Sequence, residues 1–546
     1  MKFDTSKISR LAPGIFSSSL VARTPNRFAH DSFLAVALAA FLFIASPHSA
    51  AQTALDDYIA KEDLSYDFSL DSTIAGPGVT GYNIDLTSQT WRDSTEVSHN
   101  LWQHKMTIMQ PAGIPTNTAI LFINGGGNPG SFPDPLSEEF QVIAGAALLT
   151  NSVFVNLPTV PNQLLQFAGE TSSRTEDEII AKTFANFLAG GDDEWPLLLP
   201  MVKSAVRAMD ATQAHMANLD EPVQIDKFFV FGGSKRGWTT WLTAAVDDRV
   251  SAIAPGVIDF LNIDESMQHH RRVYATGPQP PVNCASINNP AGCTLVDGFS
   301  LAVGDYVLEG VMNQFAPLPG QELSPRTQEL LDIIDPYEYR DRLDMPKYIV
   351  NSTGDQFFAP DSSQFYFDDL SGQKYLRYIP NTDHGLDASA IEGALLFHSL
   401  LELDLPLPEF SWEVSADGTS ITVTTESSEP IRVLLWEATN PLNRDFREAT
   451  FGANWVSSEL QEQEPGNDTY VASRSAPATG ATAYMIELEY DFGEKSLKFT
   501  TDISVVQIPE PVSGILLPAG IVGLLARIFH QPPSVSSRLL LLRINT

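Results

Sequence analysis

Short apolar segments alternate with longer stretches of helical period between about Trp91 and Asp404. This alternation is typical of an α/β fold with a mostly parallel sheet and helices on both faces. The segment Phe228 to Phe231 is continuously apolar, as expected for a parallel strand buried on both sides. We expect strands at Ala119–Ile123, Ser152–Asn156, Lys227–Phe231, Ala252–Ile258, Tyr348–Ser352 and Tyr375–Ile379. We expect helices at Glu178–Leu188, Leu199–Met216, Gly237–Val246, Ser362–Leu370 and Ala388–Leu403.

The pattern changes at two places along the chain. Between Asn262 and Leu343 the alternation weakens, which predicts an insertion of about residues 262–343 that acts as a lid or shapes a substrate site. After Leu405 polar and apolar residues alternate with period two, as in Ser420 to Thr424. We therefore expect a main domain of about residues 54–404 and a small C-terminal β-sandwich of about residues 408–506.

The first residues have the order of a secretory signal. Basic residues from Lys2 to Arg27 precede an apolar segment from Phe33 to Ala45, and small residues follow at positions 49–51. This order predicts a signal peptide of residues 1–51 that is removed from an exported protein. A retained N-terminal anchor is the alternative.

The last residues form a second hydrophobic segment. Pro509-Glu510-Pro511 precedes a largely apolar segment from Val512 to Ala526, and Arg527 follows. Residues 509–527 resemble a PEP-CTERM sorting signal, which implies exosortase processing and delivery to the cell surface or extracellular matrix. The tail of residues 528–546 departs from that pattern, because the signal usually ends soon after its basic residues. A plain membrane anchor is therefore the alternative.

The charge and the cysteines limit the possible partners. With 67 acidic and 33 basic residues the net charge is -34 at pH 7, so nucleic acid is not expected as a partner. Cys284 and Cys293 are the two cysteines, and in an oxidising compartment their spacing predicts a disulfide, with two free thiols as the alternative. Since no cluster of histidine and cysteine accompanies them, we expect no metal site and no cofactor.

A glycine-rich turn follows the expected strand at Lys227–Phe231. Gly232-Gly233-Ser234-Lys235-Arg236-Gly237 leads directly into an expected helix. A strand-to-helix turn of this kind lifts one side chain off the sheet as the nucleophile of an α/β-hydrolase. Ser234 is therefore the candidate nucleophile, although the usual second glycine of such a turn is replaced here by Arg236.

Two later turns supply an acid and a base in the order that an α/β-hydrolase requires. Asp355 follows the strand at Tyr348–Ser352, and His384 follows the strand at Tyr375–Ile379. A histidine in this position takes the proton of the serine, and the carboxylate holds the imidazole in orientation. Asp361 and Asp383 are the rival acids.

An early glycine-rich loop supplies the fourth part of the predicted site. Asn124-Gly125-Gly126-Gly127 follows the strand at Ala119–Ile123, as in the His-Gly-Gly-Gly loops of esterases. Glycines let backbone amides approach a developing oxyanion, and we expect donors from Gly126 or Gly127 and from the amide of Lys235.

The turn at Ser234 also carries a resemblance to a family. The segment Gly233 to Trp241 resembles the PhoPQ-activated pathogenicity-related protein family, which includes the autocrine proliferation repressor proteins of amoebae. Further matching stretches are Arg174 to Asp177, Trp195 to Leu197, Leu199 to Asp210, and Asn440-Pro441 with Arg444 to Arg447. The resemblance implies an exported α/β-hydrolase domain with a β-rich C-terminal domain.

Four charged residues are candidates for binding the substrate or the oxyanion. The turn is similar to the Gly-Cys-Ser-Arg-x-Gly turn of glucuronoyl esterases, which implies that Lys235 or Arg236 binds an anionic group or the oxyanion. Glu176 and Asp177 can hold the amino terminus of a peptide, or simply form the acidic first turn of a helix.

The combined pattern predicts an exported serine hydrolase. It would cleave a small-molecule, peptide or carbohydrate ester, or an amide, through an acyl-enzyme. The alternative is a non-catalytic surface or matrix protein that uses the hydrolase fold for binding or signalling.

Overall fold

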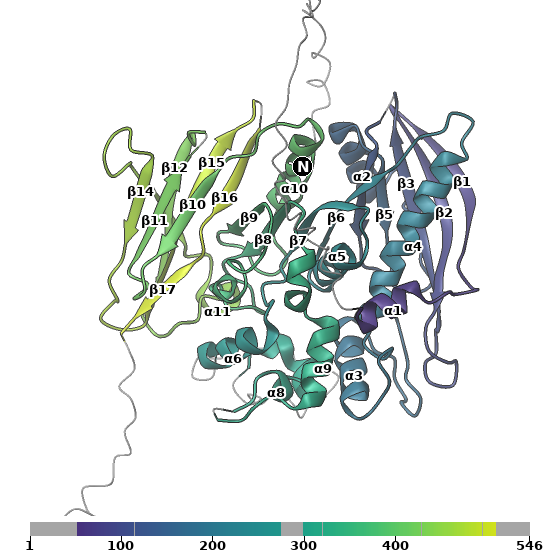
Figure 1. The fold of residues 1–546 in the computed structure, drawn as a ribbon, viewed down its shortest axis with the longest axis horizontal. Coiled ribbons are helices and arrows are strands. Elements are labelled where there is room, and N and C mark those ends of the chain that lie inside the picture. Colours follow the sequence, from purple (N-terminus) through teal and green to yellow (C-terminus); the bar gives the residue numbers. More distant parts are fainter. Residues whose placement is uncertain are drawn as a thin grey trace, which may run out of the picture. The chain divides into compact units, whose positions relative to one another are not determined.

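The computed structural model describes residues 52–508 except 114, 275–298, 319, 427 and 494 (Figure 1). The predicted signal peptide, the PEP-CTERM-like segment with its tail, and both cysteines lie outside the described residues. Within the described part of the chain, no helix combines the length and apolar character needed to span a bilayer.

A nine-stranded sheet forms the centre of the main domain (Figure 1). Its order is β1-β2-β3-β5-β4-β6-β7-β8-β9, in which β1, β2, β3 and β5 pair antiparallel and the strands from β5 to β9 pair parallel. The bounds are β1 Asp67–Gly76, β2 Val79–Thr90, β3 Leu101–Pro111, β4 Thr118–Ile123, β5 Phe154–Leu157, β6 Lys227–Gly233, β7 Val250–Gly256, β8 Lys347–Ser352 and β9 Lys374–Ile379. All six predicted strands are present, and the fold is that of an α/β-hydrolase. The three N-terminal strands were not predicted.

Two hydrophobic layers cover the two faces of this sheet. Helices α2 (Glu138–Thr150) and α10 (Ala388–Glu402) share one core with Phe229 and Phe231 of β6. Helices α4 (Leu198–Ala217) and α5 (Lys235–Val246) share the other core with Phe228 and Val230, and α1 (Ala54–Ala60) joins them. Because successive side chains of a strand point to opposite faces, the apolar segment of β6 serves both layers.

One predicted helix is wrong. The segment Ser362–Leu370 forms only a short 3-10 helix at Ser362–Phe365. Its side chains are tied to separate elements: Ser363 Oγ donates to Asp502 at 2.6 Å, and Tyr366 Oη donates to Asp259 at 2.7 Å. These long-range contacts outweigh the helical propensity of the segment.

The described part of the insertion is helical. It contains α6 (Ile263–Tyr274), α7 (Gly304–Leu308), α8 (Met312–Phe315) and α9 (Pro325–Ile334). Helix α3 (Glu176–Leu188) packs against α7 and α9, and Figure 1 shows α3, α6, α8 and α9 together below the strands. The hydroxyl of Tyr306 in α7 donates to Asp177 in α3 at 2.9 Å. The insertion is therefore anchored on the segment that carries Glu176 and Asp177.

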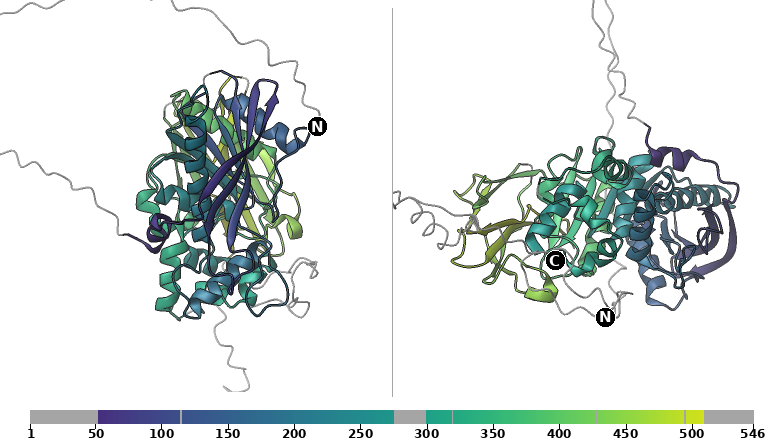
Figure 2. Two further views of the ribbon diagram at one scale, coloured as in Figure 1. Left: turned by 90° about the vertical axis from the view of Figure 1, so that its right-hand side faces the viewer. Right: turned by 90° about the horizontal axis from the view of Figure 1, so that it is seen from below.

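The C-terminal residues form two antiparallel sheets beside β9 (Figure 1, and right panel of Figure 2). One sheet has the order β10-β11-β14, and the other has the order β13-β12-β15-β16 with β17 paired to β15. The bounds are β10 Phe410–Val414, β11 Ser420–Thr425, β12 Arg432–Asn440, β13 Val456–Glu459, β14 Thr469–Ser473, β15 Ala481–Asp491, β16 Ser496–Thr500 and β17 Ser504–Gln507, with helix α11 at Glu448–Phe451. Tyr348 of β8 donates to the Lys498 carbonyl at 3.0 Å, so the two parts share hydrogen bonds as well as a core.

Candidate active site

Ser234 lies in a strained turn between β6 and α5. Its backbone has φ 59° and ψ −131°, a conformation that non-glycine residues adopt at a cost of about 1 to 3 kcal/mol. Its amide donates to the Gly256 carbonyl at the end of β7 at 2.8 Å. Ser234 is partly exposed, so the turn presents its hydroxyl at the carboxyl edge of the parallel strands.

Two glycines make this turn possible because side chains would not fit. A Cβ on Gly232 would lie 2.8 Å from the carbonyl oxygen of Arg236, and a Cβ on Gly237 would lie 2.8 Å from the carbonyl oxygen of Gly256. The position that is usually the second glycine is Arg236, and Gly237 takes over the close approach between helix and strand. The unusual spacing therefore still provides the tight packing that a nucleophile turn needs.

Asp355 and His384 form a hydrogen-bonded pair. Asp355 Oδ2 lies 2.8 Å from His384 Nδ1, and Asp355 Oδ1 accepts from the Phe357 amide at 2.7 Å. The side chain of Asp355 is 4 % exposed and that of His384 is 15 % exposed. His384 Nε2 is buried and has no hydrogen-bond partner among the described residues. The imidazole is thus held at one nitrogen and open at the other, as a general base requires.

The loop of His384 lies close to the turn of Ser234. A Cβ on Gly256 would lie 3.7 Å from Leu386 Cδ1, and the carbonyl of the same glycine accepts from the Ser234 amide. The described residues include no hydrogen bond between Ser234 and His384. In the absence of substrate such bonds are often long, so the geometry keeps both residues as candidates.

The two rival acids are engaged elsewhere. Asp361 accepts from His269 Nε2 at 2.9 Å and pairs with Arg444. Burial alone would raise the pKa of Asp361, but the charges of Arg444 and His269 outweigh it and hold the pKa well below its usual range. Asp383 is exposed and accepts from the Gly385 amide at 2.8 Å. Asp355 is the acid that the structure places on His384.

The glycine loop lies beside the turn of Ser234. Phe122 of β4 pairs with Phe231 of β6 in parallel register, and Gly125 and Ser234 each follow their paired residue by three positions, just beyond the ends of the two strands. Asn124 Oδ1 accepts a hydrogen bond from the Gly125 amide at 2.8 Å. Among the described residues, none accepts from the amides of Gly126, Gly127 or Lys235. These three amides are the donors that the sequence predicted for an oxyanion.

The basic residues after Ser234 are paired with the acidic residues of α3. Arg236 donates to both carboxylate oxygens of Glu176 at 2.7 Å. Lys235 Nζ lies 2.8 Å from Glu176 and 3.1 Å from Asp177. Burial would raise the pKa of Glu176, but hydrogen bonding and charge from Arg236 and Lys235 lower it to about 2. The candidate substrate-binding residues of the sequence analysis therefore neutralise one another.

The turn that carries Asp355 rests on the C-terminal part of the chain. The Glu448 amide donates to the Gly354 carbonyl at 2.9 Å. Arg447 is fully buried, pairs with Asp445, and donates to Ser300 Oγ at 3.0 Å. Ser300 Oγ in turn donates to the Gln356 carbonyl, next to Asp355, at 2.7 Å. The sequence marked Asp445 and Arg447 only as a family match, and this supporting role was not predicted.

A second buried carboxyl group lies behind Asp355. Asp259 accepts from Tyr366 at 2.7 Å and from Tyr378 at 2.6 Å. Burial raises the pKa of Asp259 to about 8, the nearby charge of Asp355 adds to this, and the two tyrosine hydrogen bonds oppose it. Asp259 was not a predicted site residue, because nothing in the sequence near it shows that two distant tyrosines meet it.

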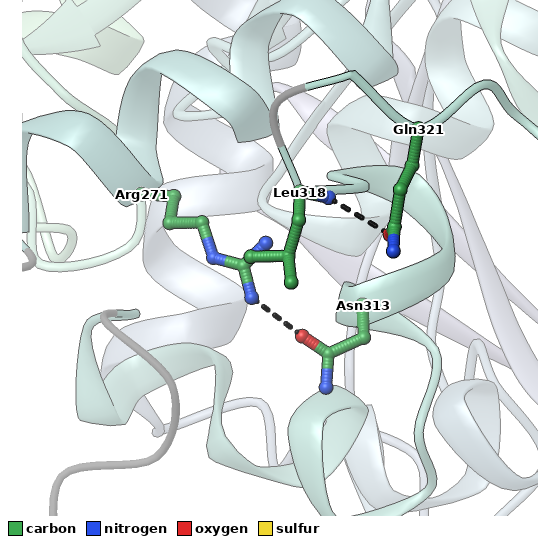
Figure 3. A pocket seen from close by; sticks show the side chains of 4 residues that line it. All are labelled: Arg271, Asn313, Leu318 and Gln321. Atoms are coloured by element: carbon green, nitrogen blue, oxygen red, sulfur yellow. Dashed lines mark hydrogen bonds between the residues drawn. The ribbon is translucent and has the colours of Figure 1, made fainter. Parts of the chain in front are cut away.

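Two hollows lie among the described residues. One lies in the insertion and has a volume of about 330 Å³. It is lined by Arg271, Asn313, Leu318 and Gln321 (Figure 3), and Arg271 donates to Asn313 at 2.8 Å. The other, of about 360 Å³, lies between α2 and the sheet and is lined by aromatic residues such as Phe231. Neither includes Ser234 or His384 in its lining.

Three carboxylates of the C-terminal part have the spacing of a cation site. The oxygens of Glu429, Glu462 and Asp468 lie within 4.8 Å of one another, and two of the three residues are exposed. Exposed acidic groups of this kind are common without a bound metal ion.

Comparison with known proteins gives a family and a relative. A family model described as PhoPQ-activated pathogenicity-related protein matches residues 55–282 and 296–447. Autocrine proliferation repressor protein A of Dictyostelium discoideum is 32% identical over 487 residues, which cover 84% of this chain and 91% of the relative.

Several solved esterase structures resemble this chain, at lower sequence identity than the Dictyostelium relative. Acetyl xylan esterase 1 of Thermoanaerobacterium sp. is 16% identical with a TM-score of 0.39, covering 64% of this chain and 91% of that chain. The acetyl xylan esterase of Paenibacillus sp. R4 is 14% identical with a TM-score of 0.41, covering 63% and 91%. The glucuronoyl esterase of Solibacter usitatus is 13% identical with a TM-score of 0.34, covering 63% and 90%. Likenesses of this degree do not identify a substrate.

Proposed function

We propose that this chain, which belongs to the PhoPQ-activated pathogenicity-related protein family, is an exported serine hydrolase that cleaves an ester or amide through Ser234, Asp355 and His384. One observation carries the proposal. His384 is held at Nδ1 by the buried Asp355, and its buried Nε2 is open. Its loop lies beside a strained serine turn on the same edge of the sheet.

The chemistry follows from these positions. His384 Nε2 takes the proton of Ser234 Oγ as the oxygen attacks the carbonyl carbon of the substrate, and Asp355 stabilises the resulting imidazolium. The tetrahedral oxyanion accepts from the amides of Gly126 or Gly127 and of Lys235. His384 then protonates the leaving group. In the second half of the reaction His384 takes a proton from water as the water oxygen attacks the acyl carbon, and it returns this proton to Ser234 Oγ as the acid product leaves.

The charges beside Ser234 favour an uncharged acyl group. Lys235 and Arg236 are matched by Glu176 and Asp177, so this pair offers no free positive charge to an anionic substrate. We therefore favour a neutral small-molecule, peptide or carbohydrate ester over an ester whose acyl group carries a free carboxylate.

We place the enzyme outside the cytoplasm. The basic, apolar and small residues of segment 1–51 support export, and residues 509–527 support attachment to the membrane or sorting to the surface by an exosortase. A disulfide between Cys284 and Cys293 belongs to the same proposal.

The test is ester hydrolysis by the triad variants. Ser234→Ala and His384→Ala should each lower turnover by several orders of magnitude, and the double variant should be little worse, because each change disables the same step. Asp355→Asn should lower turnover strongly, while Asp361→Asn and Asp383→Asn serve as controls for the choice of acid. If Asp355→Asn keeps near-normal turnover while one of the control variants loses it, the acid of the triad is the residue changed in that control, and the rest of the mechanism stands.

A second candidate function is signalling without catalysis. The name of the Dictyostelium relative describes repression of proliferation rather than an enzyme activity. Under this hypothesis the folded wild-type protein hydrolyses none of the small-molecule, peptide or carbohydrate esters with which it is tested.

A further inference from the structure

Gln163 lies between the glycine loop and the charged residues of α3. Its Nε2 donates to the Gly126 carbonyl at 2.8 Å and to Glu176 Oε1 at 2.5 Å. Its Oε1 accepts from the Glu176 backbone amide at 2.8 Å. A carboxylate only accepts and a backbone amide only donates, so these partners fix the orientation of the Gln163 side chain.

A hydrogen bond to the Gly126 carbonyl also sets the direction of the next amide. The peptide unit is planar and trans, so the Gly127 N–H points opposite to the Gly126 C=O. In the same way the Thr159 amide donates to the Gly125 carbonyl at 2.8 Å, which sets the direction of the Gly126 N–H. The loop therefore carries two amides whose directions are set by residues on the 159–163 segment.

Glu176 joins this arrangement to the turn of Ser234. The same carboxylate that accepts from Gln163 accepts from Arg236 and pairs with Lys235. Arg236 Nε also donates to the Val160 carbonyl at 2.5 Å, and a Cβ on Gly125 would lie 3.0 Å from the Arg236 guanidinium. The glycine loop and the turn that carries the Lys235 amide are thus connected through one partly buried set of contacts.

We propose that Gln163 and Glu176 are positioning residues that keep the N–H of Gly127 and the N–H of Lys235 pointing at the same place, so that both donate to the oxyanion. The inference rests on the proposed hydrolase function and extends it to two residues that need not touch the substrate. Preorganised donors act because they are already aimed where charge develops, so a misdirected amide lowers kcat more than it changes KM.

Gln163→Ala is the direct test, and Gln166→Ala is its matched control. Gln166 is a glutamine three residues further on, and its side chain donates to the Glu170 carbonyl at 2.6 Å, away from the loop. With 4-nitrophenyl acetate as substrate we expect Gln163→Ala to lower kcat by roughly 10- to 100-fold, with KM changed by less than about threefold. We expect Gln166→Ala to retain wild-type values.

Glu176 is tested by a double-variant comparison. Glu176→Gln and Gln163→Ala should each lower kcat, and the double variant should be little worse than the single ones, because both act on one amide. If Gln163→Ala does not fold, Gln163→Met keeps the side-chain length without its polar atoms, and thermal unfolding shows whether each variant is native.

The outcomes separate this inference from the proposed function. If wild type hydrolyses no ester and is not labelled by a fluorophosphonate, the hydrolase function fails. If wild type is active and folded Gln163 variants keep the kcat of Gln166→Ala, the positioning role is overturned while the triad stands. A rise in KM at constant kcat would also overturn it, because that result assigns Gln163 to substrate binding.

Discussion

Replacing Gly237 by alanine tests whether close packing of α5 on β7 positions Ser234. Gly237 lies in α5, where alanine is ordinarily favoured over glycine by about 1 kcal/mol. Here the added Cβ would meet the Gly256 carbonyl oxygen at 2.8 Å, the Gly232 carbonyl oxygen at 3.1 Å and the Gly256 nitrogen at 3.2 Å. All three are backbone atoms at the ends of β6 and β7, so no side-chain rotation relieves the contact.

The magnitude follows from the opposing terms. An added methyl group in a packed core typically costs about 1 to 3 kcal/mol, and the helix gain of about 1 kcal/mol offsets part of it, which leaves a net loss of up to about 2 kcal/mol in the free energy of unfolding. The loss of activity should be larger than the loss of stability, because the Gly256 carbonyl that the added Cβ would displace is the one that accepts from the Ser234 amide. A shift of about 1 Å at a catalytic group can cost about 100-fold in rate, so we expect a loss of about 10- to 100-fold.

The assay is the rate of fluorophosphonate labelling, measured beside urea unfolding. Gly233→Ala is the matched control in the same turn, since its Cβ would meet only Val257 Cγ2 at 3.9 Å. We expect Gly233→Ala to fold and to be labelled at nearly the wild-type rate. If Gly237→Ala is as stable and as reactive as Gly233→Ala, the packing argument for the serine turn is refuted.

Three further predictions concern stability and processing. Because the pKa of Asp259 is raised in the folded protein, its protonation stabilises the fold below about pH 4, and this stabilisation is lost as pH rises toward about 8. The wild-type free energy of unfolding in urea should therefore decline between pH 5 and pH 8, and Asp259→Asn should flatten that decline. An unchanged decline in the variant would contradict the assignment. Intact mass of protein recovered from its native cell surface should show a mature chain that begins near Gln52, and a chain that still carries Met1 would contradict export by cleavage. Alkylation without reduction should leave Cys284 and Cys293 unmodified, whereas two modified thiols would refute the disulfide.

The central strands were predictable because burial on both faces makes their sequences continuously apolar. Phe228 to Phe231 in β6 is the clearest case, and the turns after β6, β8 and β9 follow from the ends of such segments. Strands β2 and β3 were missed because they bury polar groups. His104 in β3 is 2 % exposed and bonds Ser88 of β2 and the Pro158 carbonyl. Periodicity does not show partners that are distant in sequence.

The same limit applies to the candidate site. Ser234, Asp355 and His384 each follow a recognisable strand, so their order along the chain was informative. Gln163 and Glu176 meet Arg236 from separate segments, and no local pattern in the sequence joins them. The pairing of Glu176 with Arg236 is what changes the interpretation of the turn, from a binding site for an anion to a neutralised support.

Mass spectrometry of the fluorophosphonate-treated protein tests the central claim most directly. The protein used is the chain from Gln52 onward, compared with Ser234→Ala that unfolds at a similar temperature. We predict a single phosphonyl adduct on wild type, located by peptide mapping on Ser234, and no adduct on the variant. Folded wild-type protein that takes up no adduct, or an adduct that persists in Ser234→Ala, would contradict the assignment of Ser234 as the nucleophile.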